Sequence, residues 1–125
     1  MGAVVVIAVA VGGFIGAPLR FLVDRFVTDR TETDLPVGTF LINVSGSLLL
    51  GLLTGLEIRG HLPEVAKALV AVGFCGAFTT FSTWSFETVR LLEGREYLHA
   101  ALNAVGGLIV GRAAAGAGMA LGLLT

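Results

Sequence analysis

The chain has 125 residues, of which 55% are hydrophobic and only 14% are charged, and its formal net charge at pH 7 is −1. A soluble domain of this length needs more charge to cover its surface, and a nearly neutral chain is poorly suited to binding nucleic acid. The single cysteine, Cys75, excludes a disulfide within one chain. The composition therefore indicates an integral membrane protein, with residues 1–125 forming a single domain.

Four apolar segments are long enough to cross a bilayer. We predict transmembrane helices over residues 3–23, 37–56, 65–92 and 98–124, since about 20 apolar residues span the hydrocarbon core. The charged residues gather in the connecting segments. The expected fold is an all-α, multi-pass membrane protein with four transmembrane helices. An enzyme is not indicated, because no nucleophile–base pair is visible and His61 and His99 are isolated, so we expect both histidines to be solvated.

Pairs of small residues at a spacing of four recur along the chain. Such pairs let two helix backbones approach closely. They are Gly12/Gly16, Gly51/Gly55, Gly107/Gly111 and Gly118/Gly122. Four helices enclose little space, so a polar path needs walls from several copies and we expect an oligomer, most simply a twofold dimer. The glycine pairs serve either contacts between copies or packing within one chain.

The second segment has a stripe of neutral polar side chains. Thr39, Asn43 and Ser47 are spaced i, i+4, i+8 and therefore share one helix face. Asn43 offers two N–H donors at membrane depth. The stripe suits a path for water or ions. Alternatively it makes interhelical hydrogen bonds, which contribute about 0.6 kcal/mol each in a membrane.

The third segment is interrupted. Residues 79–85 contain five hydroxyl side chains, and Gly73 and Gly76 lower the helical preference just before them. Non-helical backbone at membrane depth is tolerated only where protein or water covers it. Unwound carbonyls there suit a cation, and a half-helix N-terminus suits an anion. Phe81 and Trp84 share a helix face and either pack or present ring edges, which attract anions.

The fourth segment has a charge near its middle. Arg112 lies where a charge is costly and marks a function or a partner. It faces a vestibule, pairs across a dimer, or snorkels to the interface. Asn103 is expected to face the bundle, either as a packing residue or as a contact at a pore mouth.

Three motifs in order resemble the CrcB/Fluc family of fluoride channels, along nearly the whole chain. GGFIGAPLR at residues 12–20 resembles GGxxGAxxR, and PVGTFLINVSG at 36–46 resembles PxGTLxxNxxG. GFCGAFTTFSTWSFE at 73–87 resembles GFxGGxTTFSTFSxE. The resemblance implies an antiparallel, dual-topology dimer in the cell inner (plasma) membrane with two fluoride pores. It also implies passive export of fluoride, with no ATP motif required.

The resemblance also implies roles for particular residues. A structural Na⁺, which is not transported, would be held at the dimer centre by backbone carbonyls of Gly76 and Thr79. The expected fluoride path comprises residues from the second and third segments: Asn43, Phe81, Ser82, Thr83 and Trp84, with the stripe residues Thr39 and Ser47. Arg20 and Glu87 match family positions near helix ends, where a vestibule role or interfacial anchoring is expected.

The chain departs from the family pattern at several positions. Trp84 replaces a phenylalanine and adds an N–H donor, Ala77 stands where glycine is common, and Gly107, Gly111 and Ala115 stand where hydroxyls are frequent. With Arg112 and the arginines of the first and third loops, these departures allow a heterodimer with an oppositely oriented paralogue.

Two further functions remain as alternatives. A non-conducting membrane scaffold or partner subunit would fit the same departures. A small multidrug-type exporter would need an intramembrane carboxylate, and none precedes Glu87 within the predicted spans.

Overall fold

A computed structural model describes residues 2–125 and shows an all-helical chain over that range. Its elements are α1 (Gly2–Thr28), α2 (Val37–Ile58), α3 (Glu64–Ala66), the π-helical η1 (Lys67–Phe74), α4 (Cys75–Phe78), α5 (Phe81–Glu93), α6 (Tyr97–Ala101), the π-helical η2 (Leu102–Gly106) and α7 (Gly107–Leu124). α3, η1 and α4 follow one another without a gap, as do α6, η2 and α7.

Four units are long and apolar enough to cross a membrane: Gly2–Thr28, Val37–Ile58, Glu64–Glu93 and Tyr97–Leu124. The predicted all-α fold with four candidate spans and a break in the third is confirmed. The first helix runs five residues beyond the predicted span, to Thr28. Hydropathy marks the apolar part of a helix, whereas Asp24 and Arg25 are compatible with continued helical backbone.

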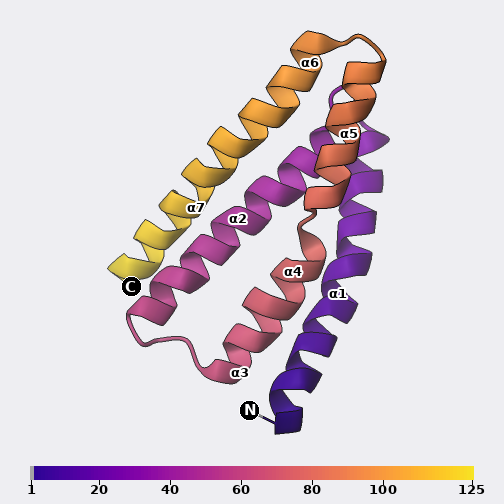
Figure 1. Ribbon diagram of the computed structural model, residues 1–125. Helices are drawn as coiled ribbons and strands as arrows, with labels where there is room; N and C mark the ends of the chain where they lie inside the picture. Colours follow the sequence, from indigo (N-terminus) through magenta and orange to yellow (C-terminus); the bar gives the residue numbers. More distant parts are fainter. Residues whose placement is uncertain (1) are drawn as a thin grey trace.

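The spans form two closely packed pairs, α2 with α7 and α1 with η1 and α4 (Figure 1). Both termini and the α2–α3 connection lie at one end of the molecule, and the α1–α2 and α5–α6 connections lie at the other. α5 continues the third span towards that second end. This arrangement is the one expected of a chain that crosses a membrane four times.

Glycines allow both helix crossings. A Cβ on Gly51 would meet the Ala115 carbonyl oxygen, and one on Gly118 would meet the Leu48 carbonyl oxygen. In the other pair, a Cβ on Gly12 would meet the Leu69 carbonyl oxygen. Similar contacts involve Gly16, Gly55, Gly73 and Gly122. Of the two uses predicted for the glycine pairs, packing within one chain is therefore realised by Gly12/Gly16, Gly51/Gly55 and Gly118/Gly122.

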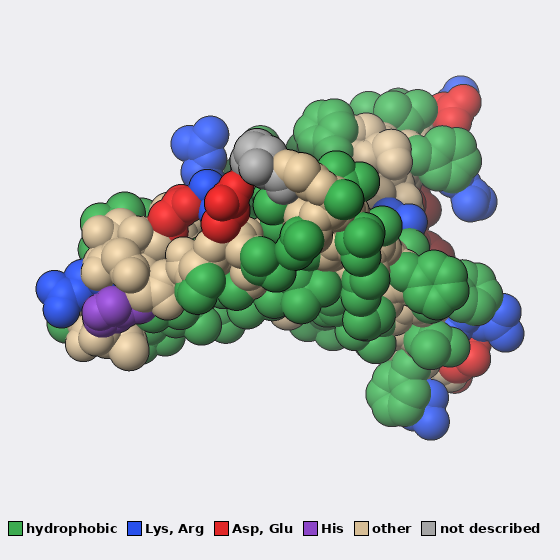
Figure 2. Space-filling view, turned by 90° about the horizontal axis from the view of Figure 1, so that it is seen from below, with side chains coloured by type: hydrophobic (Ala, Val, Ile, Leu, Met, Phe, Trp, Pro, Cys, Tyr) green, Lys and Arg blue, Asp and Glu red, His purple; other side chains and the backbone are tan. Residues whose placement is uncertain are grey.

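The surface between the two ends is apolar. Figure 2, which views the molecule from below, shows hydrophobic side chains over much of its centre and right, with charged side chains in small groups around them. Large apolar side chains stand out from the helices, among them Phe14, which is 82% exposed. A surface of this kind is stable in a lipid environment, where apolar side chains need no burial against protein.

We predict that Gly118→Ala destabilises the protein by about 1–3 kcal/mol, because the added methyl group forces apart two closely packed backbones. Gly116→Ala is the matched control, since a Cβ there meets nothing within 4 Å. Both changes raise helix propensity equally. Unfolding of the purified protein in mixed detergent micelles measures the difference, and equal stability of the two variants would contradict the crossing.

Candidate functional site

The third span is interrupted at two residues. Thr79 and Thr80 both have extended backbone, with φ/ψ of −80°/157° and −148°/118°. α4 ends before them and α5 starts after them at Phe81, which Figure 1 shows as a short linker between two helices. An interruption leaves orphan carbonyls at the end of α4 and orphan N–H groups at the start of α5. The neighbouring spans have to supply partners for these groups.

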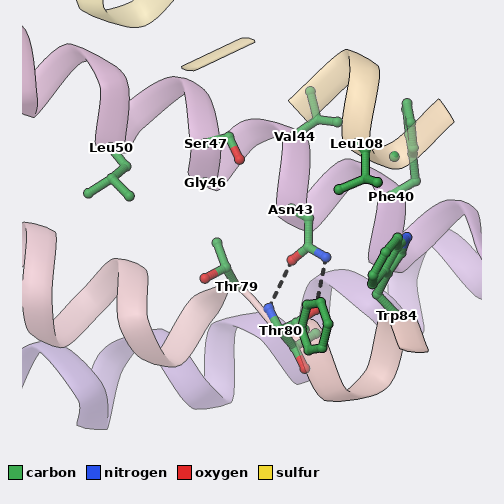
Figure 3. A pocket seen from close by; sticks show the side chains of 12 residues that line it. Phe40, Asn43, Val44, Gly46, Ser47, Leu50, Thr79, Thr80, Trp84 and Leu108 are labelled. Atoms are coloured by element: carbon green, nitrogen blue, oxygen red, sulfur yellow. Dashed lines mark hydrogen bonds between the residues drawn. The ribbon is translucent and has the colours of Figure 1, made fainter. Parts of the chain in front are cut away.

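Asn43 on α2 supplies two of these partners. Its Nδ2 donates to the Thr80 carbonyl at 2.9 Å, and its Oδ1 accepts from the Thr80 N–H at 2.8 Å (Figure 3). The two bonds satisfy both backbone polar groups of one peptide residue at membrane depth. One N–H of the Asn43 amide is thereby used, and the other has no protein acceptor within residues 2–125.

The hydroxyl groups around the break mostly bond to one another. Thr80 caps α5, because its Oγ1 accepts from the Thr83 N–H at 3.2 Å. The same hydroxyl donates to the Thr83 Oγ1 at 3.1 Å and lies 3.3 Å from the Ser82 Oγ. Thr79 turns back and donates to the Cys75 carbonyl at 2.8 Å. These bonds stabilise the break and the first turn of α5.

A groove of about 250 Å³ lies beside the break. Residues from α2, the break, α5 and α7 line it: Phe40, Asn43, Val44, Gly46, Ser47, Leu50, Thr79, Thr80, Phe81, Trp84, Gly107 and Leu108. None of them is charged. In the close-up of Figure 3, the Asn43 amide projects from α2 towards Thr80, with Ser47 further along the same helix. The groove thus combines neutral hydrogen-bonding groups with aromatic and aliphatic side chains.

Two aromatic rings border this groove at the start of α5. The ring centroids of Phe81 and Trp84 are 5.2 Å apart and their planes are tilted by 49°. Phe81 is 75% exposed, whereas Trp84 is partly buried against α7. The Trp84 Nε1 donates to the Asn103 carbonyl at 3.0 Å. The indole N–H, which the sequence suggested as an extra donor, is therefore bound to protein.

The predicted path residues fall into two groups. Asn43, Ser47, Phe81 and Trp84 line the groove, together with the predicted cation ligand Thr79. Other predicted residues lie outside it: Thr39, Ser82 and Thr83. Thr39 is buried on α2. Roles in an ion path stay a prediction for both groups.

Thr80 and Phe40 were not assigned to the path by sequence reasoning, although both line the groove. For Thr80 the available signal was its place inside the run of hydroxyl residues. Asn103, which the sequence predicted to face the bundle, is buried at 5% exposure.

The carbonyl groups at the end of α4 fit a hard cation. No hydrogen bond ends on the carbonyl oxygen of Gly76 or Thr79 within the described chain. Gly76 is exposed, and the space around its Cα is open. Carbonyl oxygens at a helix C-terminus have partial negative charge and are ligands that alkali-metal cations accept. The donor set predicted for Na⁺ is thus chemically suitable.

Charged residues gather at the end of the molecule that holds the α1–α2 connection. A second cavity of about 450 Å³ opens there. Its charged lining consists of Asp24, Asp34, Glu87, Arg90 and Glu96. The Oε1 atom of Glu87 is buried without a hydrogen-bond partner among the described residues. Of the three charges singled out from the sequence, Glu87 therefore borders a polar cavity at the end of a span.

The other two charges lie apart from both cavities. Arg20 is partly exposed on α1, and Arg112 is exposed on α7, one turn after Leu108. Neither makes an ion pair with a residue in the range 2–125.

The prediction that His99 is isolated is wrong. Its Nδ1 lies 3.2 Å from the Glu96 Oε1, and Asp34 reaches the same place from the α1–α2 connection. The three side chains place one ligand atom each within 4.8 Å of the others. Glu96 lies only three residues before His99, whereas the approach of Asp34 requires the two connections at one end of the bundle to meet.

Comparison with known proteins identifies the family. The model of the family described as "CrcB-like protein, Camphor Resistance (CrcB)" matches residues 7–119. The chain belongs to the CrcB family.

Several relatives within the CrcB family have names that state a function. "Fluoride-specific ion channel FluC 1" of Leifsonia xyli subsp. xyli is 43% identical over 98% of this chain and 89% of the relative. The protein of that name from Streptomyces avermitilis is 46% identical, over 89% and 90% of the two chains. "Fluoride-specific ion channel FluC 2" of Mycobacterium bovis is 48% identical, over 87% and 83%. These names describe channels and not enzymes, and they agree with a multi-pass membrane protein.

We predict that Asn43→Leu destabilises the protein strongly, because each of the two Thr80 backbone groups left unpaired costs about 1–3 kcal/mol. Asn43→Asp keeps the acceptor for the Thr80 N–H, but it loses the donor to the Thr80 carbonyl and adds a charge at membrane depth, so it should also destabilise the protein. Ser47→Ala is the control, since Ser47 lines the same groove and its hydroxyl makes no hydrogen bond to another residue of the described chain. Thermal unfolding in detergent ranks the three variants, and a neutral Asn43→Leu would contradict the bridging role.

Proposed function

We propose that this protein is a fluoride-specific ion channel that lets fluoride leave the cytoplasm passively. The observation that supports this most is the uncharged groove at the break, with the free N–H of Asn43 and the ring of Phe81 along it. Fluoride is small and strongly hydrated, so a pore has to replace its water without binding it too tightly to release. Single N–H donors and the positive edges of aromatic rings act as many weak partners.

The direction of flow follows from the membrane potential. An inside-negative potential drives a monovalent anion outward by about 2.3 kcal/mol per 100 mV. Export therefore needs no ATP and no coupled proton. The proposed location is the cell inner (plasma) membrane, where that potential exists.

The proposed assembly is an antiparallel, dual-topology dimer with the break of the third span at its centre. The groove beside the break is not enclosed by one chain, and a second copy would supply the missing wall of an ion path. A twofold axis in the membrane plane would bring two copies of the break together. The carbonyls of Gly76 and Thr79 from both copies would then surround one structural Na⁺, which stays bound and neutralises the two negative helix ends.

A heterodimer with an oppositely oriented paralogue is the second candidate. Arg112 favours it, because this charge is exposed near the middle of a candidate span and has no ion-pair partner among residues 2–125. A carboxylate on a paralogue would supply one, since an intramembrane charge is stable when paired or solvated. In a homodimer Arg112 would instead face a water-filled vestibule.

Purified protein in liposomes should release fluoride, but not chloride, when a K⁺ ionophore dissipates the charge. Phe81→Ile and Asn43→Asp should each abolish or strongly reduce this flux, because they remove a ring edge and an N–H donor from the path. A fluoride electrode follows the release. Efflux that appears only after a paralogue is added would favour the heterodimer, and no efflux under any pairing would refute the channel.

The proposed Na⁺ is tested separately. Protein dialysed into a large organic cation should lose fluoride flux, and Na⁺ should restore it without itself crossing the membrane. Restoration is expected because the cation relieves repulsion between the ends of two α4 helices. Radioactive ²²Na⁺ uptake into the same liposomes checks that Na⁺ is not transported. Full flux in the dialysed protein would exclude a structural role for this ion.

A further inference from the structure

The indole of Trp84 packs into a site formed by Asn103 of η2 and Gly107 of α7, which we call the seat. Its N–H donates to the Asn103 carbonyl, and its ring lies over Gly107. A Cβ on Gly107 would lie 2.8 Å from the Nε1, 3.6 Å from the Cδ1 and 3.7 Å from the Cε2 of the indole. Glycine is therefore needed at this position for the ring to lie where it does.

A small network holds the acceptor side of this seat. The buried Asn103 donates from its Nδ2 to the Thr88 Oγ1 at 2.8 Å and approaches the Trp84 carbonyl at 3.5 Å. Thr88 in turn donates to the Trp84 carbonyl at 2.9 Å. Both ends of Trp84, its indole N–H and its backbone carbonyl, are thus tied to Asn103. The indole and its hydrogen-bond acceptor are thus contributed by two residues, Trp84 and Asn103, that lie 19 positions apart in sequence.

We propose that the backbone carbonyl of Asn103 and the glycine at Gly107 position the Trp84 indole against α7, so that Trp84 lines the groove with its ring while its N–H is withheld from the ion. This inference rests on the proposed fluoride path and concerns how one of its walls is built. The Phe81 ring lies beside the indole, so its packing also depends on where the indole is held. An indole displaced from this site would place its N–H and its ring inside the groove.

The test compares fluoride flux in liposomes of four variants with that of the wild type. Gly107→Ala should lower the rate by about tenfold, because overpacking against a hydrogen-bonded ring strains the seat. Gly106→Ala is the matched control, since a Cβ there meets nothing within 4 Å, and should leave the rate unchanged. Trp84→Phe provides the reference background, because it keeps an aromatic ring at the groove but removes the indole that meets Gly107. Trp84→Phe combined with Gly107→Ala should match Trp84→Phe alone, because the smaller ring leaves room for the methyl group.

Asn103→Ala keeps the backbone carbonyl that accepts the indole N–H and removes the side-chain bond to Thr88, so it should lower the flux less than Gly107→Ala. A loss in Asn103→Ala as large as that in Gly107→Ala would show that the side-chain network governs the flux and would overturn the role of the backbone carbonyl. An equal loss for Gly107→Ala in the wild-type and Trp84→Phe backgrounds would show that Gly107 acts independently of the indole and would overturn its positioning role. Equal rates for Gly107→Ala and Gly106→Ala would overturn the seat.

Trp84 is the single tryptophan of the chain, so its fluorescence reports the seat directly. Gly107→Ala should shift the emission to longer wavelength as the ring leaves α7, whereas Gly106→Ala should not. If the wild-type protein conducts no fluoride under any pairing, the proposed function fails and the path role of Trp84 fails with it. The emission comparison then still decides whether the seat exists.

Discussion

The pair of hydrogen bonds between Asn43 and the Thr80 backbone is the constraint on which the candidate site depends. A break in a helix at membrane depth exposes polar backbone groups that lipid cannot satisfy. Asn43 satisfies one donor and one acceptor with a single amide, at 2.8 and 2.9 Å. Because the amide comes from α2, these bonds also fix the second span against the third. The groove therefore exists where it does because the break has to be bridged.

The glycine crossings complement this polar bridge by bringing the spans close enough for it to form. Apolar burial supplies little driving force between helices in lipid, so backbone proximity and interhelical hydrogen bonds have to stabilise the bundle. Gly12 and Gly16 bring α1 against the first half of the broken span, and Gly51 and Gly118 bring α7 against α2. The second half of the broken span, α5, is held mainly by polar contacts: Asn43 at its start, and Asn103 with Trp84 further along.

Much of this architecture was predictable from the sequence, because hydropathy and helix period are local properties. The four spans, the break and the shared face of Asn43 and Ser47 all follow from residues close together in the chain. The partners of the polar groups did not follow, since they lie between segments far apart: Asn43 with Thr80, and Trp84 with Asn103. The contact of His99 with Asp34 was missed for the same reason. Spacing within one helix identifies a face, but it does not identify what that face meets.

The seat of Trp84 also gives a physical account of the unusual composition of α7. Gly107, Gly111 and Ala115 have no hydroxyl to offer, so the α7 wall of the groove contributes glycine backbone and the aliphatic Leu108 but no hydrogen-bonding side chain. The close approach of α2 to Ala115 requires glycine at Gly51, and the position of the Trp84 indole requires glycine at Gly107. A hydroxyl side chain at Gly107 would collide with the indole. The large Trp84 ring on α5 therefore packs where α7 has no side chain, at Gly107. The hydrogen-bonding groups of the groove come from α2 and the break.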